Sequence, residues 1–143
     1  MAREEEGRGR RLKAQERKWT KELMAGGWTA VPNVLLYGQQ ALGLDALDVN
    51  LILHLAAMWA NGPDQPTPAK RSIAAALGVD PRTVQRRIAA LEKKGLIRRE
   101  ARHDEAEGSR ANAYHFDGLI AAALPLVRPP AVDGDKPEKP RKA

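Results

Sequence analysis

The sequence has no cysteine and few aromatic residues: three tryptophans, two tyrosines and one phenylalanine among 143 residues. Without cysteine, the chain cannot form disulfides, cysteine-based zinc sites or a thiol nucleophile, which fits a reducing cytoplasm. Because aromatic residues are scarce, the core must be built mainly from Leu, Ala, Ile and Val, which favours helices. A chain of this length is expected to form one domain.

No stretch of the sequence is apolar enough to cross a membrane. The longest apolar run, residues 51–60, is interrupted by His54, and a spanning helix needs about 20 apolar residues. The opening residues, MAREEE, are acidic and lack the apolar region of a secretory signal. We therefore expect a cytoplasmic protein with no membrane partner.

The motifs of common enzyme classes are also missing. The sequence has no Gly-rich phosphate loop, HExxH pair or nucleophile elbow. His54 has no second metal ligand one helical turn away, and the adjacent residues His103, Asp104 and Glu105 rarely converge on one ion in a loop. We expect no enzymatic activity, no cofactor and no metal site.

Positive charge is unevenly distributed along a chain of net charge +6. Residues 23–66 contain no lysine or arginine, whereas the segments on both sides are rich in them. This division suits a molecule with one face for a polyanion and another for packing or self-association.

Residues 67–100 have the pattern of two short helices joined by a tight turn and followed by a strand. Thr67 and Pro68 suit the start of the first helix, and Gly78 suits its left-handed end. Asp80 and Pro81 then supply an N-cap and first residue for the second helix. The apolar stripe of the first helix contains Ile73, Ala74 and Leu77.

The second helix has a buried seam and a cationic face. Val84, Ile88 and Leu91 recur at helical spacing and are expected to point inward. The residues near the opposite side are Arg82, Gln85, Arg86, Ala89 and Lys93. Arginine and glutamine form bidentate hydrogen bonds with base edges, and a small alanine lets the helix approach a groove floor. The alternative is an ordinary solvated helix face.

The chain before residue 67 predicts two helices and a strand. Residues 28–31 are expected to form an edge strand with Trp28 in the core. A helix over residues 32–41 should turn Val34, Leu35 and Leu36 inward and end at Gly43. A second helix, residues 46–60 capped by Asp45, is apolar nearly all round, with Met58 on one stripe. It therefore needs cover on both sides, from the helix-turn-helix and from the 32–41 helix or a second subunit.

After residue 95 the pattern predicts a wing. Two strands, residues 96–101 and 113–117, flank a polar stretch with Arg102 and Arg110 at its ends, where they would meet a phosphate backbone. Tyr114 and Phe116 should face the core. A last helix over residues 118–124, capped by Asp117, would pack through Leu119, Ile120 and Ala123 on the domain or on a partner.

These features divide the chain into three parts. Residues 1–26 form a charged arm, either a helix near residues 11–24 carrying Leu12, Trp19 and Leu23 or an irregular basic arm that adds phosphate contacts. Residues 27–124 form the folded domain. Residues 125–143 are rich in proline and charge and are expected to be disordered.

Residues 28–124 resemble a winged helix-turn-helix, which implies a mainly helical α+β fold with a small β-hairpin wing. The segment VDPRTVQRRIAALEKKGLIRR is similar to the recognition segments of GntR-type and MarR-type bacterial regulators. The segment WTAVPNVLLYGQQALGLDALDVNLILHLA resembles the opening of helix-turn-helix proteins of mobile genetic elements, including winged-helix replication initiators and DnaD-like replisome organisers.

The resemblance implies a set of DNA contacts. It places Arg82, Thr83, Gln85 and Arg86 at the groove with Arg87 beside them, Arg71 and Ser72 at phosphates, and Arg102 and Arg110 in the wing. No separate ligand domain accompanies them, which argues against small-molecule sensing.

Three functions are compatible with these patterns. The first is a homodimeric transcriptional regulator that binds specific double-stranded DNA through the helix of residues 81–94. The second is a plasmid-type or phage-type replication initiator or accessory protein that recruits replication machinery. The third is a winged helix that docks another protein.

Overall fold

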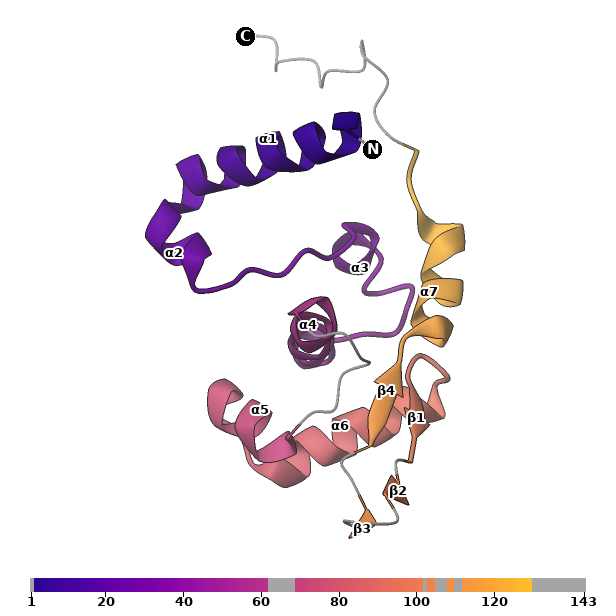
Figure 1. Cartoon of the computed structure of the whole chain (residues 1–143). Helices are drawn as coiled ribbons and strands as arrows, with labels where there is room; N and C mark the ends of the chain where they lie inside the picture. Colours follow the sequence, from indigo (N-terminus) through magenta and orange to yellow (C-terminus); the bar gives the residue numbers. More distant parts are fainter. Residues whose placement is uncertain (1, 62–68, 102, 105–107, 110–111, 130–143) are drawn as a thin grey trace, which may run out of the picture.

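The structure, a computed structural model, describes residues 2–61, 69–101, 103–104, 108–109 and 112–129 (Figure 1). It is mainly helical with one small antiparallel hairpin, so the predicted fold class is confirmed. Several predictions fall outside the described residues: the helix start at Thr67 and Pro68, the wing residues Arg102 and Arg110, and the tail beyond residue 129.

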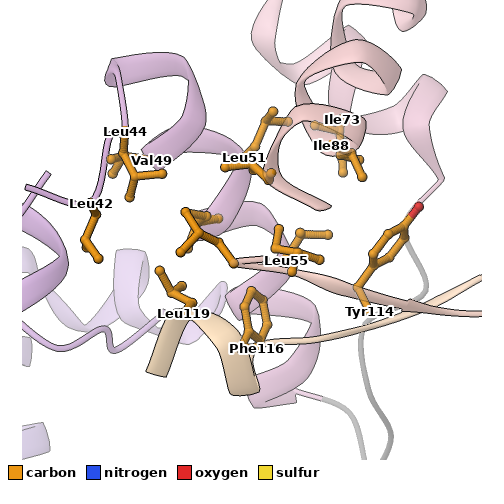
Figure 2. Packing of buried hydrophobic residues seen from close by; sticks show 14 of the residues in the cluster. Leu42, Leu44, Val49, Leu51, Leu55, Ile73, Ile88, Tyr114, Phe116 and Leu119 are labelled. Atoms are coloured by element: carbon orange, nitrogen blue, oxygen red, sulfur yellow. The ribbon is translucent and has the colours of Figure 1, made fainter. Parts of the chain in front are cut away.

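Helix α4 (Ala46–Asn61) lies at the centre of the molecule, with α3 (Val34–Tyr37) on one side and α5 and α6 on the other (Figure 1). Its first turn is closed by a reciprocal cap. The Asp48 amide donates to Asp45 Oδ1 at 2.9 Å, and the Asp45 amide donates to Asp48 Oδ2 at 3.0 Å. Leu51 and Leu55 then point into the core and are fully buried (Figure 2).

The two-helix corner consists of α5 (Lys70–Leu77) and α6 (Pro81–Lys93). Gly78 ends α5 in the left-handed conformation, with φ of 69°, and Asp80 caps α6 by accepting the Arg82 amide at 2.8 Å. The predicted turn is therefore confirmed. The first helix begins at Lys70, with Ala69 at its cap position and no side-chain cap bond.

The predicted seam of α6 is confirmed. Val84, Ile88 and Leu91 are each at most 1% exposed. They share one apolar core with the buried side of α4 and with Ile73 of α5 (Figure 2). This packing fixes which side of α6 faces outward.

The hairpin follows directly after α6. Strand β1 (Arg98–Glu100) pairs antiparallel with β4 (Ala113–His115), with Arg99 opposite Tyr114, and β2 (His103–Asp104) pairs with β3 (Gly108–Ser109). Tyr114 and Phe116 are buried, as the alternation predicted. The chain then forms α7 (Asp117–Ala123) and the 3₁₀ turn η1 (Leu124–Leu126), which runs toward α3.

Residues 2–25 form two helices separated at Thr20. Helix α1 (Ala2–Trp19) is longer than the predicted helix and breaks at Thr20, whose φ is 78°. The hydroxyl of Thr20 caps α2 (Lys21–Ala25) by accepting the Leu23 amide at 3.3 Å. Neither helix contains a buried residue.

The structure corrects the predictions for residues 28–41. Residues 28–31 form no strand, because Gly27 (φ 102°) and the imino nitrogen of Pro32 leave too short a run between them to pair. Trp28 is not a core residue, since 52% of its surface is exposed. The expected helix of residues 32–41 is reduced to α3, which stops at Gly38, and Leu36 is 49% exposed rather than inward.

Met58 of α4 and Ile120 of α7 are exposed within the described chain, so the second subunit or partner that would cover them stays a prediction. One smaller correction concerns the start of α7. Asp117 is the first residue of α7 rather than its cap. Its carboxylate contacts Arg98 at 3.4 Å, and Phe116 occupies the cap position.

Gly118 is required where α7 crosses the end of α6. The Leu119 amide donates to the Leu96 carbonyl at 2.9 Å, and a Cβ at Gly118 would overlap the carbonyl oxygen of Gly95. We expect Gly118→Ala to lower the free energy of unfolding by about 1–3 kcal/mol, because the backbone must move apart.

The measurement is urea unfolding followed by circular dichroism. Gly9→Ala is the matched control, since a Cβ there meets no neighbouring atom and alanine is a better helix former. Equal stability of Gly118→Ala and the unaltered chain would show that this crossing is not tightly packed.

Candidate nucleic-acid interface

The side of α6 opposite its buried seam forms an exposed cationic surface. We call it the α6 outer face, and its residues are Arg82, Gln85, Arg86, Ala89 and Lys93, all exposed. Among the described residues, no carboxylate lies within ion-pairing distance of its three basic side chains. Their charge is therefore directed at solvent and open to an anionic partner.

Thr83 lies in the first turn of α6 and is half-buried, beside the capping residue Asp80. Its own amide is already used, because it donates to the Asp80 carbonyl at 2.9 Å. The first turn of a recognition helix is the part that reaches base edges in helix-turn-helix proteins. Thr83 is thus at the border of the surface rather than at its centre.

Helix α5 adds Arg71 and Ser72, both exposed in its first turn. Within the described residues, Arg71 has no acidic partner at ion-pairing distance. The first helix of such a corner crosses the nucleic-acid backbone while the second enters the groove. The predicted division between phosphate contacts on α5 and base contacts on α6 is compatible with this placement.

Arg87 is placed differently from the other predicted site residues. Its guanidinium contacts the carboxylate of Asp45 and lies 3.5 Å from that of Asp48, so it joins α6 to the cap of α4. Lys94, two turns later on the same side, donates to the Gly43 carbonyl at 2.6 Å. Together Arg87 and Lys94 attach α6 to the start of α4.

Sequence reasoning missed this attachment. The available signal was the helical spacing of Arg87, three residues after Val84 and four before Leu91, which places it at the edge of the buried seam. A second signal was the acidic pair Asp45 and Asp48 in a stretch without any basic residue.

Electrostatics favour this contact. The hydrogen bond from the Asp48 amide, followed by that from Arg87, holds the pKa of Asp45 below its ordinary value. In return, the Asp45 carboxylate raises the pKa of Arg87. Both groups are fully charged at neutral pH, so the charge of Arg87 is compensated within the fold.

The basic residues at the base of the hairpin are also compensated. Arg98 lies 3.4 Å from Asp117, and Arg99 lies 4.0 Å from Glu92. The uncompensated positive charge in this part of the fold is therefore concentrated on the outer sides of α5 and α6. Because Arg102 and Arg110 are outside the described residues, their role in the wing stays a prediction.

The described residues hold neither a metal-binding cluster nor a membrane-spanning helix. No group of three or more His, Asp or Glu side chains there is arranged to hold a metal ion. No described helix is long and apolar enough to span a membrane.

The fold and its cationic surface agree with a family match. Residues 42–97 match a family model described as a helix-turn-helix domain. The match runs from the turn before α4, through the corner of α5 and α6, to Ile97 after α6. The fold of this segment is that of a helix-turn-helix domain. No curated protein matches the chain.

The helix-turn-helix domain supports DNA as the partner of the chain. Its α6 is the second helix of the corner, the one that enters the major groove in this class of domain. The matched model does not distinguish GntR-type or MarR-type regulators from replication proteins, so the narrower resemblance stays a prediction.

The contact between α4 and α6 predicts a pH-dependent stability. Because folding lowers the pKa of Asp45, its stabilisation is present above the ordinary pKa of aspartate, about 4, and is lost as pH falls through the lowered value. We expect Asp45→Asn to lower the Tm at pH 7 and to have less effect as the pH falls below this range. Asparagine caps helices as well as aspartate, so the substitution tests the charge.

Thermal unfolding across this pH range is the measurement. In an Arg87→Gln background, the effect of Asp45→Asn at pH 7 should shrink, since its partner is gone. A Tm difference that is the same at all pH values would contradict the role of the ion pair.

Proposed function

We propose that this protein is a transcriptional regulator that binds specific double-stranded DNA by inserting α6 into the major groove. The observation that carries this proposal is the α6 outer face. It presents uncompensated cations, a glutamine and a small alanine on a helix whose opposite side is locked into the core. A rigid helix of this composition has the hydrogen-bond donors that base readout requires, and its small alanine lets it come close to the bases.

Each residue has a separate role in this proposal. Arg82, Gln85 and Arg86 contact base edges, and Thr83 contacts the groove margin. Arg71, Ser72 and Lys93 contact phosphates, which sets the position of the domain on the duplex. Arg87 stays with Asp45 and supports α6 rather than contacting DNA.

The active form is a homodimer. A single helix reads only a few base pairs, and two copies related by a two-fold axis read two half-sites one helical turn apart. The similarity of the α6 segment to GntR-type and MarR-type regulators supports this arrangement. Binding would block or recruit transcription machinery at a promoter.

A role in plasmid or phage replication is the second candidate. It is favoured by the resemblance of residues 28–56 to replication proteins and by an exposed apolar surface on α4 and α7, away from α6, which leaves room to recruit other machinery. DNA fragments retained by the purified protein distinguish the two. A palindrome at a promoter favours the regulator, and an array of direct repeats favours replication.

The proposal predicts different effects for base-contacting and phosphate-contacting residues. Arg86→Ala should weaken binding to the selected site by about 1–3 kcal/mol and relax the preference at one base position. Arg71→Ala should weaken binding to all duplexes alike and reduce the slope of log affinity against log salt by about 1.

Fluorescence anisotropy with the selected duplex and a scrambled duplex, over a salt series, gives both quantities. Arg128→Ala removes the same charge on the α3 side of the molecule, where Arg128 stacks on Tyr37, and should change neither. Unchanged binding by both Arg86→Ala and Arg71→Ala would show that DNA does not use this surface.

A further inference from the structure

A groove on the side of the domain away from α6 is almost entirely apolar. It lies between α4, α7 and the segment before α3, and has a volume of about 520 Å³. Its walls include Val31, Trp59, Phe116, Ile120 and Val127, and the rings of Trp59 and Phe116 are 5.3 Å apart. Ile120 is 49% exposed there. An open apolar surface of this kind marks a site of association.

The arm formed by α1 and α2 has exposed apolar side chains that could bind such a groove. Leu12 and Trp19 are seven residues apart in α1, which places them along one face of that helix, and Leu23 lies in α2, after the break at Thr20. They are 37%, 60% and 66% exposed. The arm therefore presents a leucine and tryptophan ridge that no part of the described chain covers.

This arm has little reason to be ordered alone. Helices of this length are marginal in water unless an apolar face packs against a partner. Since neither α1 nor α2 contains a buried residue, the stabilising partner of the ridge must come from elsewhere. An apolar groove is the surface that an amphipathic helix occupies.

Charge also matches the arm to the groove. Residues 1–22 carry eight basic and five acidic side chains. The elements that build the groove, residues 27–61 and 117–127, contain no lysine or arginine and only acidic charges. A cationic helix can approach this face without repulsion, whereas the α6 side of the domain would repel it.

The arm does not fill the groove of its own chain. Residues 30–32, only a few positions after α2, line the rim of that groove, while α1 and α2 lie outside the layer formed by α3, α4 and α7 (Figure 1). We infer that the arm of one copy docks its α1 ridge, formed by Leu12 and Trp19, into the apolar groove of a second copy, and that the exchange is reciprocal. This inference rests on the homodimer of the proposed function and identifies its interface.

A reciprocal exchange gives two equal contacts in each dimer. An α-helix of 18 residues is about 27 Å long, and a reciprocal exchange buries two arms and two grooves. Stable interfaces bury about 1,200–2,000 Å² in total. The exchange also leaves both α6 outer faces on the surface, because the groove is on the other side of α4.

The test is the mass of the full chain in solution without DNA, measured by sedimentation equilibrium over a concentration series. The unaltered chain should have twice its 15.7 kDa mass. Trp19→Glu on the arm and Ile120→Glu on the groove should each raise the dimer dissociation constant by about tenfold or more, since both bury a charge in the same apolar contact. Both positions are exposed in the single chain, so neither substitution should prevent folding.

Arg10→Gln is the matched control. It lowers the net charge by one, as Trp19→Glu and Ile120→Glu do, but lies on the opposite side of α1 from the ridge, and it should leave the dimer intact. A monomeric unaltered chain would overturn the inference, as would a dimer that tolerates Trp19→Glu and Ile120→Glu. Neither result depends on DNA, so the proposed function is judged separately by the anisotropy of Arg86→Ala.

Discussion

The structure depends on the packing of one side of α6 against α4 and α5. Val84, Ile88 and Leu91 are the most deeply buried residues of α6, and each is close to its limit of burial. The side chains of a helix keep fixed directions around its axis. When the seam is buried, the cations and the glutamine on the other side of α6 must therefore face the solvent. The residues of the α6 outer face are thus exposed because of an apolar contact on the opposite side of the helix, although the residues of that contact do not reach the outer face.

A polar attachment refines this apolar packing. Apolar contacts are not directional and allow a helix to slide or rotate slightly, whereas hydrogen bonds from Arg87 and Lys94 require specific acceptors. These acceptors are the cap of α4 and the turn at Gly43, which is itself left-handed with φ of 70°. Two basic residues, Arg87 in α6 and Lys94 at its C-cap, therefore set the position of this helix, and its other basic residues remain available for a partner.

The predictable part of the fold is the part coded by local chemistry. Gly78, Asp80 and Pro81 act within a few residues of themselves, so the turn and the start of α6 could be predicted, and the seam followed from spacing alone. The segment containing Trp28 failed for the opposite reason. Its β-branched and aromatic residues are compatible with a strand, but a strand also needs a partner, and whether one is near depends on the whole fold.

The same limit applies to the surface. The exposed residues of α6 followed from periodicity, because only one arrangement buries the seam. The role of Arg87 did not, since a residue at the edge of a helical face is directed by whatever packs beside it. Asp45 and Asp48 are about forty residues away in sequence, and sequence spacing does not show that they meet α6.

The distribution of charge links the two faces of the domain. Helix α4 contacts the seam of α6 on one side and borders the apolar groove on the other. Its residues and its neighbours in α3 and α7 include no lysine or arginine, although the chain as a whole is basic. A polyanion is therefore attracted to one side of α4 only. The other side has an apolar surface without basic residues, so charge repulsion does not prevent another apolar surface from binding there. The sequence of α4 therefore keeps the DNA-binding side and the apolar groove on different sides of the domain, because a helix that is apolar nearly all round must be covered on both sides.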